Sequence, residues 1–391
     1  MRLTRSFQKE DWDSSKKIII YGAGRYGEIA LRGLEKVGLW ADFFADRDYP
    51  GKEYFGVPVI QPAGLTKYRS EIFLIASLNY FYEMYRQLQQ IGADNIYDIE
   101  ALMDGLDESQ LSEYALDEKK NIQKYQDMIR FGNQSGLVIR HIELVVTERC
   151  SLKCRHCASL MPYYTYPTDF AWARVTGEFD RFLSTIDLLL ELRILGGEPF
   201  LYKDLHKMIN KYTQCEKIKR VTIYTNATVV PGDQAVQALK NSKVSVHISD
   251  YGLLSKKLKE LQQIFTNQNI SHTIHHYEKW YDMGPVSKRD DDDSALKKRY
   301  DRCYAANCHT FLDGRLYICP RAAHGENLGF FHNGPGETVD FKEGRTDIQE
   351  KRKQLLQMLD GKRIFEACRY CGGGGGRSPE VRAAEQMGSD L

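Results

Sequence analysis

Short apolar runs alternate with amphipathic stretches along the first hundred residues. The pattern predicts three strands and two helices, namely strands at Lys17–Tyr21, Ala41–Ala45 and Glu71–Ile75 and helices at Arg25–Lys36 and Tyr80–Gln90. Strands that alternate with helices are typical of a parallel α/β sheet. We therefore expect residues 1–100 to form a small Rossmann-like domain. Residues 101–137 are polar, with sparse apolar positions, and we interpret them as a helical linker.

A second α/β series begins near residue 138. Its predicted strands are Ile142–Val146, Leu192–Leu195, Arg220–Tyr224, Val244–Ser249 and His272–His276, and the predicted helices between them include Phe179–Leu190, Asp204–Tyr212 and Lys256–Phe265. Repeated β-loop-α units of this length suit a parallel barrel, open or closed, in which ligands bind at the carboxyl ends of the strands. We expect this barrel over residues 138–299. Residues 300–391 are loop-rich and punctuated by cysteines, and are expected to form a separate extension.

Composition narrows the classes of function. The chain has 391 residues, of which 54 are Lys or Arg and 53 are Asp or Glu, so the net charge is +1. A nearly neutral chain is unlike a nucleic-acid binder that depends on a basic face. The sequence contains no apolar run near the roughly 20 residues that span a bilayer, and its charged start has no apolar signal-peptide core. We expect a cytoplasmic protein of two or three domains.

Nine cysteines fall into two groups, with Cys215 alone between them. An odd number in a long chain without an export signal argues against a disulfide framework and for two metal sites. The first group is Cys150-x3-Cys154-x2-Cys157, directly after a predicted strand. Three thiolates on one loop suit an iron–sulfur cluster or zinc. A closed zinc site needs a fourth ligand, for which His156 is the candidate on the same loop.

This loop resembles the signature of the radical S-adenosylmethionine (SAM) superfamily, in which three cysteines follow the first strand of a partial (β/α)6 TIM-like barrel. Gly196-Gly197-Glu198-Pro199, after the second strand, is similar to the family's Gly-Gly-Glu-Pro motif. The resemblance implies a 4Fe–4S cluster on the three cysteines. It also implies that the backbone and Glu198 receive the methionine ammonium group of SAM, which suits glycines that permit close approach and a carboxylate that pairs with a cation.

Further contacts to SAM are expected at the next strand ends. Asn226 lies in Thr225-Asn226-Ala227, where the family often has Thr-Asn-Gly, and is expected to bond the ribose or the carboxylate of SAM. Ser249 and Asp250 are either contacts to SAM or substrate or helix caps. We also expect His156, which lies within the three-cysteine loop, to be one of the residues that surround the bound SAM.

The resemblance also implies a radical mechanism. The open iron of the cluster would bind the amino and carboxylate groups of SAM. One electron would then cleave SAM and produce a 5′-deoxyadenosyl radical, which takes a hydrogen atom from the substrate. A reducing partner such as flavodoxin or ferredoxin would supply the electron, and the protein would orient the reactants and exclude water.

The second cysteine group resembles the twitch, or truncated SPASM, extension of this superfamily. The expected ligands of its auxiliary 4Fe–4S cluster are Cys303, Cys319, Cys368 and Cys371, and a structural zinc is the alternative. Asp313-Gly314 predicts a hairpin turn between the first two. Cys308 could replace Cys303 as a ligand, and the one left unligated could return a hydrogen atom to a substrate radical. We interpret the glycine run 372–376 as a flexible connector.

A glycine-rich turn, Gly22-Ala23-Gly24-Arg25-Tyr26-Gly27, joins the first predicted strand to a helix, and Asp46 ends the next strand. A dinucleotide fingerprint has this arrangement, with glycines for the turn, a helix N-terminus for phosphate and an acid for a ribose hydroxyl. Phe55–Ile60 resembles small Rossmann-like domains on bacterial surface-polysaccharide and sugar-nucleotide enzymes. Gly22, Gly24, Gly27 and Asp46 therefore suit a sugar-nucleotide or other nucleotide-diphosphate site, an NAD(P) site, or an inert docking domain.

These features predict a radical SAM enzyme that acts on carbohydrate, with a nucleotide-linked sugar or another surface-polysaccharide precursor as substrate. The expected chemistry is oxidation, dehydration or epimerisation at a carbon that bears a hydroxyl. Modification of a ribosomally made peptide is the rival function, although no winged-helix leader-binding pattern is seen in the sequence. A metal-cluster scaffold that recruits partners is the alternative that is not an enzyme.

Overall fold

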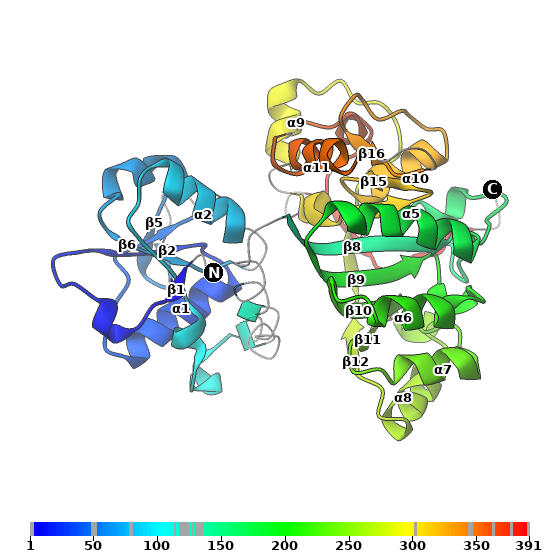
Figure 1. The fold of residues 1–391 in the computed structure, drawn as a ribbon, viewed down its shortest axis with the longest axis horizontal. Helices are drawn as coiled ribbons and strands as arrows, with labels where there is room; N and C mark the ends of the chain where they lie inside the picture. Colours follow the sequence, from blue (N-terminus) through cyan, green and yellow to red (C-terminus); the bar gives the residue numbers. More distant parts are fainter. Residues whose placement is uncertain are drawn as a thin grey trace. The chain divides into compact units, whose positions relative to one another are not determined.

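The computed structural model describes residues 4–47, 53–77, 81–112, 115–116, 125–126, 129, 137–300, 303–342, 347–361, 364–375 and 378–388. The chain divides into two compact units, unit 1 (Met1–Gly136) and unit 2 (Leu137–Leu391). Each unit is built around a parallel sheet (Figure 1). Within the described ranges, no helix combines the length and the apolar character needed to cross a membrane.

Unit 1 contains one mainly parallel sheet. In spatial order its strands are β1 (Arg5–Ser6), β7 (Asn95–Asp98), β6 (Ile72–Ile75), β2 (Ile18–Tyr21), β3 (Phe43–Ala45), β5 (Val57–Ile60) and β4 (Glu53–Tyr54). Only β4 is antiparallel, in a hairpin with β5. Helix α1 (Arg25–Lys36) follows β2, and α2 (Phe81–Gln90) follows β6. The apolar pattern predicts these two helices and β2, β3 and β6, but not the remaining short strands.

The segment 101–137 is not a free linker where the structure describes it. Glu28 of α1 accepts hydrogen bonds from the backbone nitrogen and the hydroxyl of Ser112, both at 2.6 Å. Tyr125 is fully buried and stacks on Tyr26 with 5.1 Å between ring centroids. These contacts make the described part of the segment a component of the core of unit 1. Most of the predicted linker helix lies outside the described residues.

Unit 2 is centred on an eight-stranded sheet. In spatial order its strands are β12 (His272–His276), β11 (Val244–Asp250), β10 (Ile218–Thr225), β9 (Leu188–Gly196), β8 (Val138–Thr147), β14 (Thr310–Leu312), β15 (Arg315–Tyr317) and β16 (Thr338–Asp340). The strands from β8 to β12 run parallel and in chain order. Figure 1 shows the connecting helices along one face of them, namely α5 (Trp172–Thr185), α6 (Leu205–Thr213), α7 (Asp233–Leu239) and α8 (Leu258–Asn267).

The parallel series differs from the predicted one at one place. The predicted helix Phe179–Leu190 ends at Thr185, and β9 begins at Leu188. Leu188–Leu190 is a continuous apolar run, which periodicity alone assigns neither to a helix nor to a strand. Because β8 and β10 flank this run and pair with it, the run becomes part of the centre of the sheet.

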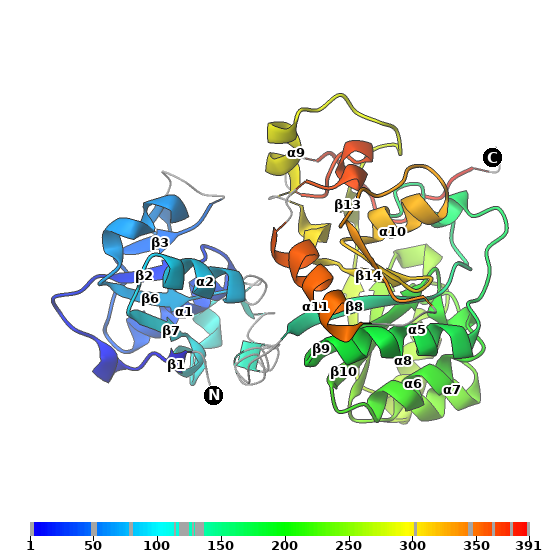
Figure 2. The same ribbon diagram turned by 45° about the horizontal axis from the view of Figure 1, so that its top comes forward.

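Three strands from the C-terminal part of unit 2, β14, β15 and β16, extend the same sheet. β14 runs parallel to β8, with Thr310 opposite Glu143 (Figure 2). Asp313 and Gly314 form the turn between β14 and β15, with φ of 49° and 74°, so the predicted hairpin is confirmed. The remaining elements are α9 (Asp293–Tyr300), α10 (Pro320–Asn327), α11 (Ile348–Leu356) and the antiparallel pair of β13 (Lys279–Tyr281) and β17 (Glu380–Arg382).

The parallel strands of unit 2 have apolar side chains on one face of the sheet and polar side chains on the other. Leu192, Ile194 and Ile223 are fully buried and belong to one apolar cluster with residues of the covering helices. The alternate positions carry polar side chains, which we call the polar face: Glu143, Glu191, Arg193, Thr222, Tyr224, His247 and His275. The apolar face thus supports the sheet, and polar side chains gather on the opposite face.

Candidate active site

A loop with three cysteines follows β8 at the carboxyl edge of the parallel sheet. β8 ends at Thr147, and Cys150, Cys154 and Cys157 come next. Cys154 is buried, and the other two are partly buried. The loop therefore lies where parallel α/β sheets bind their ligands, as the sequence predicts.

Two glycines allow the end of β9 to approach this loop. A Cβ added to Gly196 would lie 2.1 Å from the carbonyl oxygen of Thr147. A Cβ added to Gly197 would lie 2.3 Å from the carbonyl oxygen of Arg149 and 2.6 Å from Cβ of Cys150. Because any side chain would separate the two segments, the Gly-Gly pair is required for their contact. Pro199, after Glu198, begins a short 3₁₀ turn.

Glu198 is fully buried. Its carboxylate accepts hydrogen bonds from other residues of the protein. The carboxylate accepts hydrogen bonds from Phe200 N at 3.1 Å, from Thr225 Oγ1 at 2.8 Å and from Asn226 N at 2.8 Å. Burial raises the pKa of Glu198 to about 7. The side chain thus ties the ends of β9 and β10 together. The contact of Glu198 with an ammonium group of a ligand stays a prediction. Because the carboxylate is already hydrogen-bonded, the backbone of the Gly-Gly-Glu-Pro motif is the part that remains to contact such a group.

Asn226 connects the end of β10 to the three-cysteine loop. Its Nδ2 lies 3.7 Å from Cys150 Sγ and 3.3 Å from Ser151 Oγ. Its Oδ1 accepts a hydrogen bond from Thr228 N at 3.0 Å. The next residue, Ala227, has a φ of 57°, in the left-handed region that favours glycine. Alanine therefore adopts here a backbone conformation that glycine adopts more readily.

The end of β11 carries Ser249 and Asp250. The Asp250 carboxylate accepts a hydrogen bond from Gly252 N at 2.9 Å, and its other oxygen lies 2.9 Å from His276 Nδ1. Asp250 thus fixes the turn after β11, and its contact with SAM or substrate stays a prediction. Ser249 is partly buried, and its contact with a cofactor stays a prediction.

A segment far along the chain covers the three-cysteine loop, and we call this segment, Glu380–Met387, the strap. Its backbone pairs with the loop at both ends of Gln386: Arg155 N donates to Glu385 O, and Met387 N donates to Lys153 O, both at 2.7 Å. The Gln386 side chain donates from Nε2 to Cys154 Sγ at 3.4 Å. No sequence signal indicates that the strap covers the loop. Backbone groups and one side-chain amide form the hydrogen bonds, and Gln386 and Cys154 are 232 residues apart in the sequence.

His156 is engaged by carboxylates. Its Nδ1 lies 3.0 Å from Asp282 Oδ1, and its Nε2 lies 3.8 Å from Glu385 Oε2. The ring therefore joins the loop to the strap and to the segment after β13, and it does not stand ready as a fourth zinc ligand. Its grouping with the cofactor residues stays a prediction.

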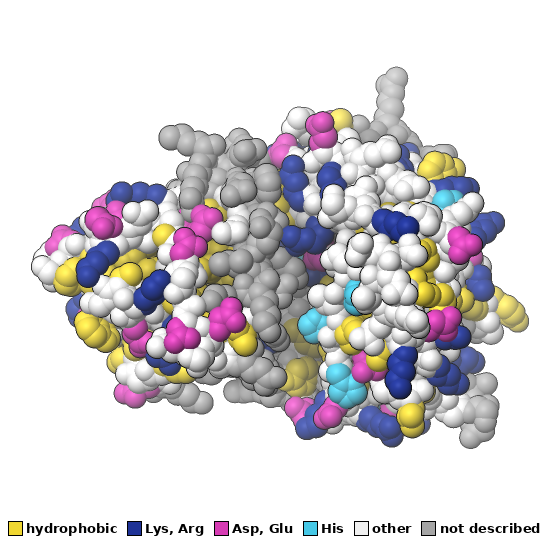
Figure 3. Space-filling view, turned by 90° about the horizontal axis from the view of Figure 1, so that it is seen from below, with side chains coloured by type: hydrophobic (Ala, Val, Ile, Leu, Met, Phe, Trp, Pro, Cys, Tyr) yellow, Lys and Arg dark blue, Asp and Glu magenta, His cyan; other side chains and the backbone are white. Residues whose placement is uncertain are grey.

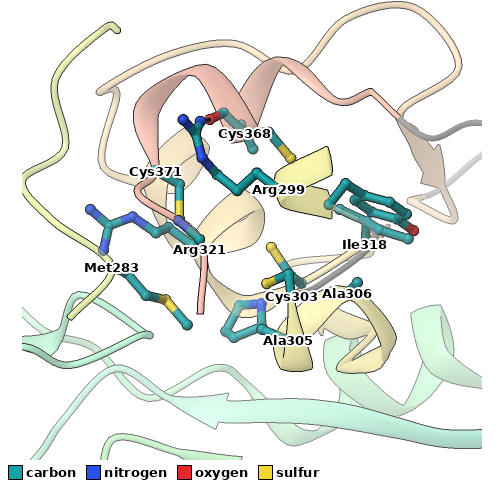
Figure 4. A pocket seen from close by; sticks show the side chains of 14 residues that line it. Met283, Arg299, Cys303, Ala305, Ala306, Ile318, Arg321, Cys368 and Cys371 are labelled. Carbon is teal, nitrogen blue, oxygen red and sulfur yellow. Dashed lines mark hydrogen bonds between the residues drawn. The ribbon is translucent and has the colours of Figure 1, made fainter. Parts of the chain in front are cut away.

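The second cysteine group lines one cavity, with an empty volume of about 500 Å³ that includes the part open to solvent. The four cysteines in its wall are Cys303, Cys319, Cys368 and Cys371. Figure 4 shows the sulfurs of the three labelled cysteines, Cys303, Cys368 and Cys371, directed toward a shared space. Backbone amides reach three of the four sulfurs: Gly374 N lies 3.4 Å from Cys303, Ala322 N 3.4 Å from Cys319 and Gly373 N 3.2 Å from Cys371.

The glycine run that we interpreted as a flexible connector is part of this cavity. Gly372 N donates to Met283 O at 2.6 Å, and Gly373 and Gly374 supply two of the amides that reach sulfur. A Cβ added to Gly373, whose φ is 81°, would lie 2.6 Å from Cγ of Arg299. The glycines therefore let the backbone wrap closely around the cysteines, a role that composition alone does not reveal.

The donor set of both groups fits an iron–sulfur cluster. Burial raises the pKa of Cys150, Cys154 and Cys368 to about 12, so an electropositive partner is needed to hold these sulfurs as thiolates. Across the described residues, no three or more Cys, His, Asp or Glu side chains are grouped closely enough for a single metal ion. A four-iron cluster makes a different demand, since each cysteine binds a different iron.

A comparison with family models gives a match that includes the first site. The model of the radical SAM superfamily matches residues 144–269, which include the three-cysteine loop, Gly196-Gly197-Glu198 and Asn226. Residues 144–269 are thus similar to the radical SAM superfamily.

Curated relatives match a part of the chain. The chain is 31% identical over 102 residues to a GTP 3′,8-cyclase of Staphylococcus saprophyticus, covering 24% of this chain and 29% of that protein. It is 30% identical over 148 residues to a GTP 3′,8-cyclase of Staphylococcus aureus, covering 35% of this chain and 40% of that protein. The match thus spans less than half the length of these relatives.

Solved structures show a distant likeness. BtrN in complex with AdoMet and 2-DOIA is 15% identical with a TM-score of 0.39, and the match covers 64% of this chain and 97% of that chain. Native anSMEcpe with bound AdoMet and Kp18Cys peptide is 14% identical with a TM-score of 0.38, and the match covers 61% of this chain and 89% of that chain.

Cys308 and Glu143 are neighbours at the polar face, joined by Thr310. The Thr310 hydroxyl lies 3.2 Å from Glu143 Oε2 and 3.0 Å from the Cys308 carbonyl oxygen. Cys308 does not line the cavity of the other four cysteines. Burial raises the pKa of Glu143 to about 7 and that of Cys308 to about 12. The structure thus separates Cys303 from Cys308, which the sequence leaves as alternatives.

The polar face continues as a row of stacked rings. Arg193 lies over the Tyr224 ring at 5.3 Å, and Tyr224 and His247 stack with 4.5 Å between centroids. His275 stacks on His247 at the same distance. Figure 3 shows histidine side chains on the surface of unit 2, and His275 on the edge strand β12 is exposed. This row supplies both flat apolar surface and polar atoms to a ligand.

In unit 1 the glycine turn has the local geometry that the fingerprint requires. Gly22 has a φ of 116°, and a Cβ added to Gly27 would lie 2.1 Å from Gly22 O. A Cβ added to Gly24 would meet nothing within 4 Å. Asp46 accepts a hydrogen bond from Ala23 N at 2.8 Å, so its carboxylate holds the turn. Binding of a nucleotide by these four residues stays a prediction.

Proposed function

We propose that this protein is a radical SAM enzyme with two iron–sulfur clusters. The observation that carries this proposal is the meeting of three strand ends: Gly197 packs against Cys150, and the Asn226 side chain reaches the Cys150 sulfur at 3.7 Å. Cys150, Cys154 and Cys157 would hold the SAM-binding 4Fe–4S cluster, and Cys303, Cys319, Cys368 and Cys371 an auxiliary 4Fe–4S cluster. When bound, the clusters and SAM supply electron transfer and removal of a hydrogen atom from the substrate.

We infer that the substrate is a carbohydrate, with a nucleotide-linked sugar or another surface-polysaccharide precursor as the expected compound. The polar face offers hydrogen-bonding groups in pairs. Glu191 accepts hydrogen bonds from Arg193 at 3.0 Å and from Thr222 at 2.6 Å, which fixes both donors. Hydroxyl groups both donate and accept, so a surface of fixed donors, acceptors and ring faces suits a sugar.

The residues of the polar face would orient the sugar, and Glu143 and Cys308 would handle hydrogen. With a pKa near 7, Glu143 can exchange a proton with a substrate hydroxyl at neutral pH. Cys308 would give its sulfur-bound hydrogen atom to a carbon radical, forming a new C–H bond and leaving a thiyl radical. One electron from a reductant such as flavodoxin or ferredoxin, and one proton, would restore the thiol. This pair supports epimerisation among the three proposed outcomes.

Anaerobic reconstitution tests the proposal. The protein is loaded with iron and sulfide, reduced with dithionite and given SAM, and we expect 5′-deoxyadenosine to form. Cys154→Ala should abolish its formation, because one cluster ligand is lost. Cys215→Ala is the matched control, since Cys215 lies in neither cysteine group, and it should keep wild-type rates. A protein that binds zinc instead of iron, or that leaves SAM intact, would contradict the proposal.

Substrate class is tested in the same assay. Nucleotide-linked sugars, free sugars and short peptides are each added, and the amount of 5′-deoxyadenosine is compared with the amount without substrate. We expect stimulation by a sugar compound, with transfer of deuterium from a deuterated sugar into 5′-deoxyadenosine detected by mass spectrometry. Stimulation by peptides alone would favour the rival function.

A further inference from the structure

Arg321, on α10, is a buried cation that the proposed mechanism does not use. Its exposed fraction is 5%, and its Nε has no hydrogen-bond partner among the described residues. Its Nη2 donates to the carbonyl oxygen of Gly284, which is a neutral acceptor. No ion pair to a carboxylate is formed by Arg321 within the described parts of the chain. Because a buried charge is expensive without a counter-charge, an anion is expected beside it.

Arg321 lies beside the second cysteine group and close to the three-cysteine loop. It lines the cavity together with Cys303, Cys319 and Cys371 (Figure 4). Ala158, next to Cys157 of the three-cysteine loop, packs against the buried cluster of Met283, Ala305 and Cys371. The guanidinium therefore lies in the wall of a cavity that the three-cysteine loop adjoins.

A short segment joins the same three parts. Gly284 O accepts the hydrogen bond from Arg321, and Gly284 N donates to Asp282 Oδ1 at 2.8 Å. The same oxygen of Asp282 lies 3.0 Å from His156 Nδ1 in the three-cysteine loop. Between them, Met283 O accepts the hydrogen bond from Gly372 N, next to Cys371. Residues 282–284 thus contact both cysteine loops and fix the guanidinium at their junction.

We propose that Arg321 is a counter-ion shared by the two cysteine sites, and that it raises the reduction potential of both clusters. This inference rests on the proposed function, because it requires a cluster at each site. Reduction adds a negative charge to a cluster, and a fixed buried cation stabilises the more negative state. Arginine suits this position because its guanidinium stays protonated even when buried. Arg321 is a positioning residue, since it acts on the clusters and not on the substrate.

Reduction potentials measured by electron paramagnetic resonance at graded applied potentials test the proposal. Arg321→Gln removes the charge, and we expect both clusters to become harder to reduce. Arg321→Lys keeps the charge, and we expect potentials close to those of the wild type. A C150A/C154A/C157A background, which retains the four cavity cysteines but not the three-cysteine site, separates the auxiliary signal from the other.

Arg299→Gln is the matched control. Arg299 lines the same cavity, but its Nη2 lies 2.6 Å from the Asp291 carboxylate, which already balances its charge. We expect its replacement to leave the potential of the three-cysteine site at the wild-type value.

The outcomes separate this inference from the proposed function. Wild-type iron content with an unmoved potential at the three-cysteine site in Arg321→Gln overturns the inference alone. Absence of iron from the wild-type protein overturns the proposed function and the inference with it. If Arg321→Gln loses iron, Arg321→Met and Arg321→Lys decide. Loss from both sites in the neutral variant with retention in the lysine variant supports the shared role, whereas loss from the cavity alone overturns it.

Discussion

Cys303 and Cys308 are five residues apart, and only the first lines the cavity of the second cysteine group. A 3₁₀ turn, Tyr304–Asn307, separates them, and Cys308 leads into β14 beside Glu143. Spacing along the chain predicts two sulfurs near one turn but not the direction of each. That direction depends on β14 pairing with β8, which is a contact between distant parts of the sequence.

The position of Cys308 gives a prediction for single-residue chemistry. In deuterated buffer, a thiol that returns hydrogen to the substrate would place deuterium on the product carbon. We expect Cys308→Ala to lose this deuterium, measured by mass spectrometry of the product, while 5′-deoxyadenosine still forms. Cys215→Ala should incorporate it as the wild type does. Wild-type incorporation by Cys308→Ala would exclude the proposed role.

At the scale of elements, the strap packs directly against the three-cysteine loop. Ala384, in the strap, is fully buried against Leu152 and Cys154, and the Gln386 side chain bonds both the Cys154 sulfur and Lys153 N. An exposed ion pair between Glu385 and Arg155 lies beside these contacts. The buried contacts are expected to matter and the exposed pair is not, because surface ion pairs contribute little.

Two adjacent substitutions test the strap. Gln386→Glu keeps the acceptor for Lys153 N but removes the donor to sulfur and places a negative charge near it. We expect faster loss of iron from the three-cysteine site to a chelator, by several-fold, followed by absorbance. Glu385→Gln should release iron at the wild-type rate. Equal rates in all three proteins would mean that the strap does not protect the site.

At the scale of the whole molecule, short sequence patterns predict the individual elements better than the contacts between distant segments. Glycine spacing and apolar periodicity identify the α/β units, the three-cysteine loop and the Asp313-Gly314 hairpin. They do not identify the strap, the cysteine-binding glycines or the joining of β14 to β8, because each depends on contacts between residues far apart in the sequence. Segment 101–137 is missed for the same reason, since Tyr125 and Ser112 pack on α1 or its neighbours.

Because the chain has two units, we expect nucleotide binding in unit 1 to be separable from cluster binding in unit 2. Gly24 lies in the glycine turn of unit 1 with open space where a side chain would be, so Gly24→Val should fold normally but block the approach of a diphosphate. We expect loss of UDP binding by calorimetry, with an unchanged melting temperature and unchanged iron content. Gly64→Val, at another glycine with open space, is the control and should bind UDP as the wild type does. Equal binding by both variants would refute a nucleotide site at this turn.

The long sequence separation between the strap and the loop that it covers has a consequence for biosynthesis. A ribosome completes Cys154 well before it reaches Gln386, 232 residues later. During that interval the nascent loop is uncovered and accessible to an iron–sulfur carrier. Cofactor delivery is therefore easiest before translation of the strap ends, and refolding of the finished, empty chain would have to open the strap again.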